Sequence, residues 1–154
     1  MKARDLMTSD PTTCRPSDNL KAVIAVMRKE DCGLVPITEG NGEQRVTGVA
    51  TDRDIALALG ERDEKPSAVR ASEVMTTKIV SCEPDAEVHE VSRKMQEAQV
   101  RRILVVEDGR LLGVISTADL ARASTQSSKD RVGNEVEKVM EKVSEDTGSQ
   151  RSRT

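Results

Sequence analysis

The feature of this 154-residue chain that most limits its possible folds is an internal repeat. The two copies align at an offset of 68 residues, at Met7 with Met75, Thr8 with Thr76, Cys14 with Cys82, Pro16 with Pro84, Val23 with Val91, Met27 with Met95 and Glu39 with Glu107. Later pairs align at an offset of 65, namely Gly48 with Gly113, Val49 with Val114, Asp54 with Asp119 and Ala56 with Ala121. The three-residue difference lies between Gly40 and Arg45, where turn residues indicate a longer hairpin loop in the first copy.

Each copy predicts the same order of elements: a short extended segment, a helix, two strands joined by a hairpin, and a second helix. The extended segments are Thr12–Cys14 and Val80–Cys82, the strands are Leu34–Ile37, Val46–Thr51, Ile103–Val106 and Leu111–Ser116, and the closing helices begin near Asp52 and Thr117. Helical periodicity groups apolar residues at Leu20, Val23, Ile24 and Met27, and at Val88, Val91 and Met95. The expected helix caps are Ser17 or Asp18 in the first copy and Asp85 in the second. Asp108-Gly109 is the strongest hairpin signal.

One copy of ~55 residues would be marginally stable alone, so the copies are expected to pack on each other. The predicted fold class is α+β, with two β-α-β-β-α repeats packed pseudo-symmetrically through their sheets, followed by a C-terminal helix and tail. The expected domain bounds are residues 1–60 for the first repeat, 61–71 for a linker, 72–124 for the second repeat and 125–154 for the helix and disordered tail.

The predicted C-terminal helix carries one apolar stripe, formed by Val132, Val136, Val139, Met140 and Val143. Three interpretations stay open: the helix packs back on its own domain, it docks on a second subunit, or it frays into the tail that follows.

Composition excludes several classes of function. The chain contains no Phe, Tyr or Trp and has a formal net charge of -3, which speaks against nucleic-acid binding. No apolar run reaches the ~18 residues of a membrane span, and no signal peptide is recognisable, so the expected location is the cytoplasm. Three scattered cysteines and a single histidine argue against a disulfide framework or a metal site.

The repeat resembles the CBS domain, named after cystathionine β-synthase. The resemblance rests on Gly48-Val49-Ala50-Thr51-Asp52-Arg53-Asp54 and Gly113-Val114-Ile115-Ser116-Thr117-Ala118-Asp119, with Leu6-Met7-Thr8 and Val74-Met75-Thr76 opening the copies. It covers about Ala3 to Ser124 and is similar to stand-alone prokaryotic members. The resemblance implies that the copies pair, that clefts between them bind AMP, ADP, ATP or another adenosyl compound, and that pairs form homodimers. No cofactor is required, and a regulated partner protein is possible.

The chemistry of the two motifs is consistent with a nucleotide site. Because each motif crosses from a strand into a helix, Thr51 and Ser116 are expected beside free backbone N–H groups, which favour phosphate. Asp54 and Asp119 follow one turn later and can accept hydrogen bonds from ribose hydroxyls. The resemblance implies that ribose role. The alternative is that each hydroxyl serves only as a helix cap. In the first copy, Asp52 is the better candidate for a residue that only caps the helix.

Further binding residues come from position and resemblance. Arg101 and Arg102 precede a strand where related sequences carry phosphate-binding cations, and Arg53 lies inside the first motif. The resemblance assigns Thr13 and Ser81 to the base edge or ribose and Pro36 to the adenine slot, where the second copy has Leu104. The positions equivalent to Arg101 and Arg102 are Gly33 and Leu34, so the two clefts are expected to differ in affinity.

The leading hypothesis is therefore a regulatory sensor rather than an enzyme. Ligand binding would change the conformation, and a partner would respond to that change. The alternative is a structural dimer or scaffold whose clefts stay empty. A third hypothesis is an enzyme or redox protein that uses a cysteine, although Cys14 and Cys82 are predicted to be core residues.

Overall fold

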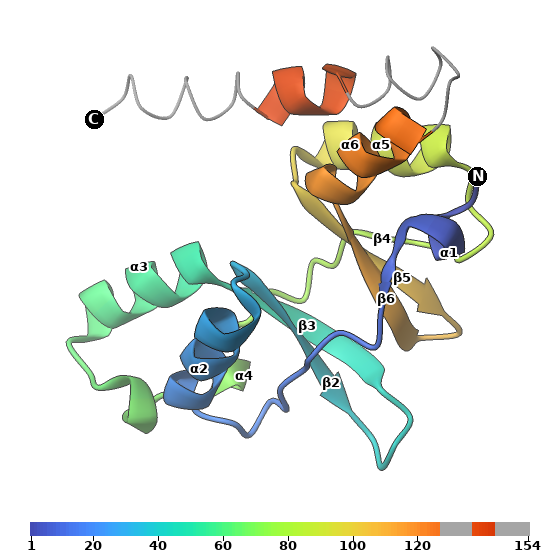
Figure 1. Cartoon of the computed structure of the whole chain (residues 1–154). Helices are drawn as coiled ribbons and strands as arrows, with labels where there is room; N and C mark the ends of the chain where they lie inside the picture. The colour runs from blue at the N-terminus through green and yellow to red at the C-terminus, as the bar shows by residue number, and fades with distance from the viewer. Residues whose placement is uncertain (127–136, 144–154) are drawn as a thin grey trace. The chain divides into compact units, whose positions relative to one another are not determined.

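The computed structural model describes residues 1–126 and 137–143, and these residues form two compact units (Figure 1). The first-copy unit consists of Asp10–Ile79 and Asp108–Leu111. The second-copy unit consists of Met1–Ser9, Val80–Glu107 and the described residues from Leu112 onward. Both units mix helices with strands in the predicted order, so the α+β fold class of two repeats is confirmed.

The first-copy unit is built around one antiparallel hairpin. Its elements are α2 (Leu20–Glu30), β2 (Leu34–Glu39), β3 (Arg45–Thr51), α3 (Asp52–Arg62), the 3-10 turn η1 (Pro66–Ala68) and α4 (Ala71–Val74). The helix α2 packs on β2 and α3 packs on β3 (Figure 1). The buried core is Cys14, Leu20, Val23, Val35, Ile37, Ala50, Ile55, Val69 and Ala71. Val69 and Ala71 show that the predicted linker contributes to this core.

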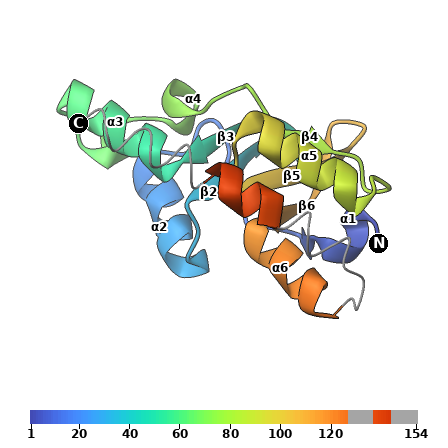
Figure 2. The same cartoon turned by 90° about the horizontal axis from the view of Figure 1, so that it is seen from above.

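The second-copy unit repeats this plan. Its elements are α1 (Ala3–Leu6), β1 (Thr8–Ser9), β4 (Ser81–Cys82), α5 (Val88–Ala98), β5 (Arg102–Glu107), α6 (Thr117–Gln126) and, from Leu112 onward, β6 (Arg110–Ser116). The short β4 pairs in parallel with β5, β1 pairs antiparallel with β6, and α5 packs on β4 and β5 (Figure 2). Its core is Ala3, Cys82, Ala86, Val88, Val91, Met95, Ile103, Val105, Ile115, Leu120 and Val139.

The segment that opens each sequence copy belongs to the unit of the other copy. In the second-copy unit the N–H of Ala3 donates to the carbonyl of Ala86 at 2.8 Å, and fully buried Ala3 joins the core. In the first-copy unit the N–H of Ala71 donates to the carbonyl of Asp18 at 2.7 Å. Both bonds connect equivalent positions, since each partner is shifted by 68 residues. Each unit therefore combines most of one sequence copy with the opening segment of the other copy.

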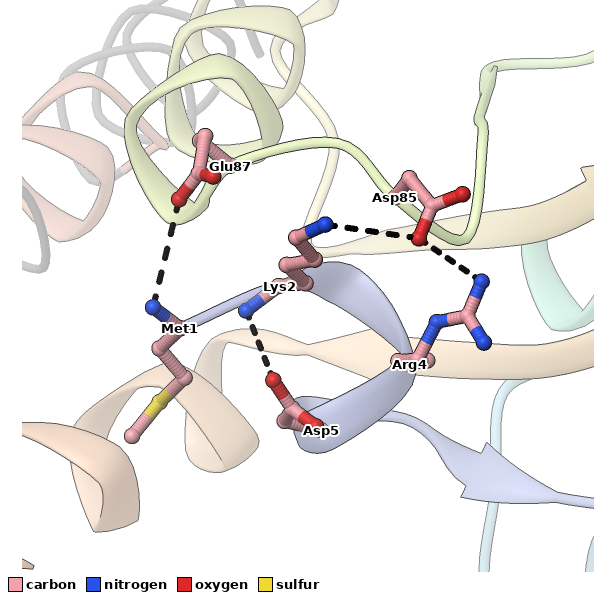
Figure 3. Close-up of polar contacts among 6 residues, drawn as sticks. All are labelled: Met1, Lys2, Arg4, Asp5, Asp85 and Glu87. Atoms are coloured by element: carbon pink, nitrogen blue, oxygen red, sulfur yellow. Dashed lines mark hydrogen bonds and ion pairs between the residues drawn. The ribbon is translucent and has the colours of Figure 1, made fainter.

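Ion pairs accompany this exchange on the surface of the second-copy unit (Figure 3). The Arg4 guanidinium lies 2.7 Å from a carboxylate oxygen of Asp85, and Lys2 Nζ lies 3.6 Å from the same oxygen. Asp85 is thus not the predicted helix cap: the N-cap of α5 is Glu87, whose side chain makes no capping bond. Exposed pairs of this kind contribute little to stability, so the buried backbone contacts hold the segment.

The predicted caps of the first helix are also displaced. Because α2 begins at Leu20, its N-cap is Asn19, whose side-chain oxygen accepts from the N–H of Ala22 at 3.0 Å. Asp18 instead accepts from the N–H of Arg15 at 2.7 Å, and Ser17 lies before the cap position. The chain therefore enters the helix later than the sequence pattern suggests.

The apolar helix faces and both hairpins are confirmed. Leu20, Val23, Val91 and Met95 are fully buried. Asp108 and Gly109 both have positive φ angles, as a two-residue hairpin turn requires. The longer loop of the first copy lies between β2 and β3, where the three-residue difference was located.

A helix covers residues 137–143, within the predicted C-terminal helix. Val139 and Val143 are buried, and Val139 belongs to the second-copy core, which agrees with packing on the chain's own domain. Met140 was predicted on the same stripe, but it is 51% exposed because it is one residue away from Val139 and faces outward. Val132, Val136 and the predicted disordered tail lie outside the described residues.

Candidate functional site

The first-copy motif lies where β3 passes into α3. Thr51 is the N-cap of α3, and its hydroxyl oxygen accepts from the N–H of Asp54 at 3.2 Å. Asp54 is half-buried, and its carboxylate has no hydrogen-bond partner among residues 1–126 and 137–143. Arg53 is exposed between them. The motif thus presents a free carboxylate one turn into the helix.

Asp52 is not the pure cap that the sequence suggested, because Thr51 takes that position. Its carboxylate accepts from the N–H of Arg53 at 2.8 Å. Its backbone N–H donates to the carbonyl of Gly33 at 3.0 Å. A Cβ atom at Gly33 would lie 2.8 Å from an Asp52 carboxylate oxygen, so the acid covers the start of β2.

The second-copy motif closes on itself. The Ser116 hydroxyl accepts from the N–H of Asp119 at 3.2 Å and donates to its carboxylate at 3.0 Å, while the N–H of Ser116 donates to the same oxygen at 2.8 Å. Arg122 binds the other carboxylate oxygen. Asp119 is only 8% exposed, whereas the Arg122 side chain is 70% exposed. The Asp119 carboxylate therefore accepts three hydrogen bonds, whereas the Asp54 carboxylate accepts none from the described residues.

The two predicted phosphate-binding arginines lie beside this second motif. The carbonyl of Arg101 accepts from the N–H of Thr117 at 3.0 Å, which fixes the start of β5 against the start of α6. Arg102 follows as the half-buried first residue of β5. Of the arginines near this motif, Arg122 is the one whose side chain binds Asp119.

The residues predicted to contact the base are held by neighbouring strands. The first-copy unit places Thr13 next to Cys14, whose N–H donates to the carbonyl of buried Pro36 at 3.1 Å. Pro36 lies opposite Val49, two residues before Thr51 in β3. In the second-copy unit Ser81 lies opposite Leu104 in the parallel pair. Each unit therefore brings its extended segment and its motif to one short hairpin.

Two polar residues that the sequence did not single out hold these segments. The amide oxygen of Gln44 accepts from the hydroxyls of Thr13 at 3.2 Å and Thr38 at 3.1 Å. The Lys94 ammonium donates to the carbonyl of Ser81 at 3.1 Å. In the sequence, the only feature that marks Gln44 is its place in the longer hairpin loop of the first copy. No sequence feature marks Lys94 as a partner of Ser81, because the two residues are 13 positions apart.

A hollow of about 240 Å³ adjoins the second motif. It is lined by Met1, Asp5, Leu6, Met7, Thr8, Asp119, Arg122 and Ala123. The motif acid and Arg122 thus face an open space together with the opening segment, whose part in this unit the sequence did not predict. A second hollow of about 210 Å³ lies in the first-copy unit, and none of the residues that line it belongs to the motif.

The cysteines are placed for packing. Cys14 and Cys82 are buried, and burial raises the pKa of each thiol from 9.0 to about 11. Both thiols are therefore protonated at neutral pH, which removes the nucleophilic form. Within residues 1–126 and 137–143, no cluster of three or more metal-binding side chains occurs.

Comparison with known proteins assigns the family. The CBS domain matches residues 3–61 and again residues 71–125. The chain belongs to the CBS domain family. The two matches correspond to the two sequence copies, so this is a tandem pair.

Two bacterial relatives are similar over most of their length. The chain is 34% identical over 140 residues to the uncharacterized protein YlbB of Bacillus subtilis, covering 91% of this chain and 92% of YlbB. It is 33% identical over 120 residues to Hypoxic response protein 1 of Mycobacterium tuberculosis, covering 78% and 82%.

Solved CBS structures share the fold. The crystal structure of Hypoxic Response Protein I with two coordinated zinc ions matches with a TM-score of 0.70 and 32% identity, over 79% of this chain and 98% of that one. CBSX2 in complex with AMP matches at 0.69 and 21% identity, over 81% and 96%. The CBS pair of MJ0100, with 5′-methylthioadenosine and S-adenosyl-L-methionine, matches at 0.70 and 23% identity, over 82% and 97%.

Proposed function

We propose that this CBS pair is a regulatory module that binds an adenine nucleotide or another adenosyl compound and is not itself an enzyme. The observation that carries the proposal is the hollow lined by Asp119 and Arg122, with the Ser116 hydroxyl bound to the same carboxylate. A hydroxyl, a carboxylate and an arginine are the kinds of group that bind a ribose and a phosphate. The adenosyl ligands of CBSX2 and MJ0100, which share the fold, support the same ligand class.

The expected ligands are AMP, ADP and ATP, with other adenosyl compounds possible. Binding would stabilise one conformation, and a regulated protein or a second subunit would recognise it. The clefts between the copies, the homodimer and the cytoplasmic location stay predictions. No helix in the described part of the chain is long and apolar enough to cross a bilayer.

One observation favours the alternative of a ligand-free scaffold. Thr51 and Ser116 both cap helices, and Asp119 is bound by its own cap and by Arg122. Such residues could be retained for helix stability alone. The two functions differ in whether nucleotides stabilise the protein.

A thermal-unfolding panel separates them. Wild-type protein is heated with AMP, ADP, ATP, NAD or S-adenosylmethionine at about a hundredfold excess over Kd. A specific ligand then adds about 2.7 kcal/mol, or roughly 5–10 °C in Tm. The double variant Asp54→Asn/Asp119→Asn should lose that increase relative to its own ligand-free Tm.

The matched control is Glu97→Gln, which removes an exposed charge of α5 and should keep the increase. A flat response of the wild type to all five compounds would support the scaffold instead. An increase that survives in the double variant would place binding away from the motifs.

A further inference from the structure

The hollow of the first-copy unit has no part in the proposed function, because no motif residue lines it. Its volume is about 210 Å³, and its lining consists of Arg15, Pro16, Ser17, Thr38, Glu39, Gly40 and Asn41. Pockets for drug-sized molecules measure about 300–1,000 Å³, so this hollow fits a smaller molecule. Its lining is mostly polar, which points to a polar occupant.

The walls of this hollow are fixed by hydrogen bonds. The N–H of Thr38 donates to the carbonyl of Cys14 at 2.9 Å, which joins β2 to the segment that leads to Arg15. Asp18 closes the turn after that segment: its carboxylate accepts from the N–H of Arg15 at 2.7 Å, and its own N–H donates to the Arg15 carbonyl at 3.0 Å. Thr38 is buried, and its hydroxyl donates to Gln44 at 3.1 Å. The hollow is therefore formed before any ligand binds.

The chemistry of the hollow is specific to the first copy. Arg15 aligns with Glu83 and Ser17 aligns with Asp85, so the second copy has two acids at these positions. Asn41 lies in the hairpin loop that is three residues longer in the first copy. The repeat therefore does not account for the arginine, the hydroxyl and the amide that line this hollow.

The hollow offers one cation and one carboxylate to a ligand. The side chains of Arg15 and Glu39 make no hydrogen bond or ion pair with any residue that the structure describes. Glu39 lies opposite Arg45 in the β2–β3 ladder, but the Arg45 guanidinium binds Glu43 at 3.0 Å instead. Asp18 binds the backbone N–H of Arg15 and not its guanidinium. Both charged side chains are thus available.

Two neutral polar side chains complete the lining. Ser17 and Asn41 supply a hydroxyl and an amide, and neither side chain has a partner among residues 1–126 and 137–143. The carboxylate of Glu39 disfavours a phosphate, and the guanidinium of Arg15 disfavours a simple cation. A small molecule that carries one carboxylate and one ammonium group matches both charges, because arginine binds carboxylates and a carboxylate accepts from ammonium.

We infer that this hollow binds a free α-amino acid with a short polar side chain. Arg15 binds the carboxylate of the ligand, and Glu39 binds its ammonium group. Ser17 and Asn41 contact its polar side chain. This site is separate from the motifs and needs no adenosyl ligand, so the inference goes beyond the proposed function.

Amide chemical-shift titrations of the full chain with three probes test the inference. L-serine carries both charges, N-acetyl-L-serine lacks the ammonium group, and L-serinamide lacks the carboxylate. L-serine should give saturable shifts at Arg15–Ser17 and Thr38–Asn41. The other two probes should bind about fivefold or more weakly, because each lacks one charged hydrogen-bonding group.

Variants assign each charge to its residue. Arg15→Gln should weaken L-serine by about fivefold or more and leave L-serinamide unchanged, since that probe has no carboxylate to lose. Glu39→Gln should weaken L-serine similarly and leave N-acetyl-L-serine unchanged. The matched controls Arg28→Gln and Glu61→Gln remove exposed charges from α2 and α3 and should leave all three affinities unchanged.

Three results would overturn the inference. They are equal affinity for the three probes, L-serine binding that survives in both Arg15→Gln and Glu39→Gln, and the absence of any saturable shift with L-serine. None of them involves the response of the second motif to AMP, so failure here is distinguishable from failure of the proposed function.

Discussion

The glycines of the two motifs are required by close packing. A Cβ atom at Gly113 would lie 2.7 Å from the carbonyl oxygen of Thr8 and 2.7 Å from the sulfur of Met7. At Gly48 it would lie 2.8 Å from the carbonyl oxygen of Thr76. In each unit the motif glycine therefore packs directly against the Met-Thr pair, which explains why both features recur in the two copies.

Replacing Gly113 by alanine should destabilise the protein by about 1–3 kcal/mol, since backbone must move to admit the methyl group. Gly60→Ala is the matched control: it lies in α3 with nothing within 4 Å of the new atom. That change should stabilise by about 0.5–1 kcal/mol. Urea unfolding measures both, and equal effects would contradict the packing argument.

The buried thiols predict a pH dependence. Cys14 and Cys82 have a pKa of about 11 when folded and 9.0 when exposed. Between these values the unfolded chain loses protons that the folded chain keeps, so stability falls as pH rises above 9. The expected loss is about 1 kcal/mol per thiol from pH 8 to pH 10.

Urea unfolding at both pH values measures this loss. The Cys14→Ala/Cys82→Ala variant should retain less of the pH dependence than the wild type. Identical pH dependence in the two proteins would show that the thiols do not titrate in this way.

At the scale of elements, the local patterns predicted most of the fold. Helix faces and hairpins follow from spacing between neighbouring residues, and Leu20, Val23, Val91 and Met95 were placed correctly. The exchange of opening segments was not predictable, because both units offer equivalent backbone partners 68 residues apart. Helix caps were missed by one or two residues, since Ser, Asp and Asn can all cap and only the backbone path chooses among them.

The helix at 137–143 gives an element-scale prediction. Val139 is fully buried in the second-copy core, whereas its neighbour Met140 is 51% exposed. Val139→Asp should destabilise by about 3 kcal/mol or more, because it buries an unpaired charge. Met140→Asp should stay within about 0.5 kcal/mol.

Thermal unfolding of the two variants checks this pair. Equal Tm values for Val139→Asp and the wild type would mean that the helix does not pack on its own domain in solution.

At the scale of the whole molecule, the candidate site was predictable in part. The sequence located Thr51, Asp54, Ser116 and Asp119 at strand-to-helix junctions because the motif repeats. It did not predict that the Asp119 carboxylate would be hydrogen-bonded while the Asp54 carboxylate has no partner among the described residues, since that depends on side-chain geometry. Nor did it predict the lining of the hollow by the opening segment, which comes from over a hundred residues away.

Amide chemical-shift mapping by NMR during an AMP titration tests most directly whether the motifs hold the ligand. The account predicts that the largest saturable shifts fall on Arg102, Ser116 and Asp119. Saturable shifts centred instead on the hollow at Arg15–Ser17, or none at millimolar AMP, would contradict it.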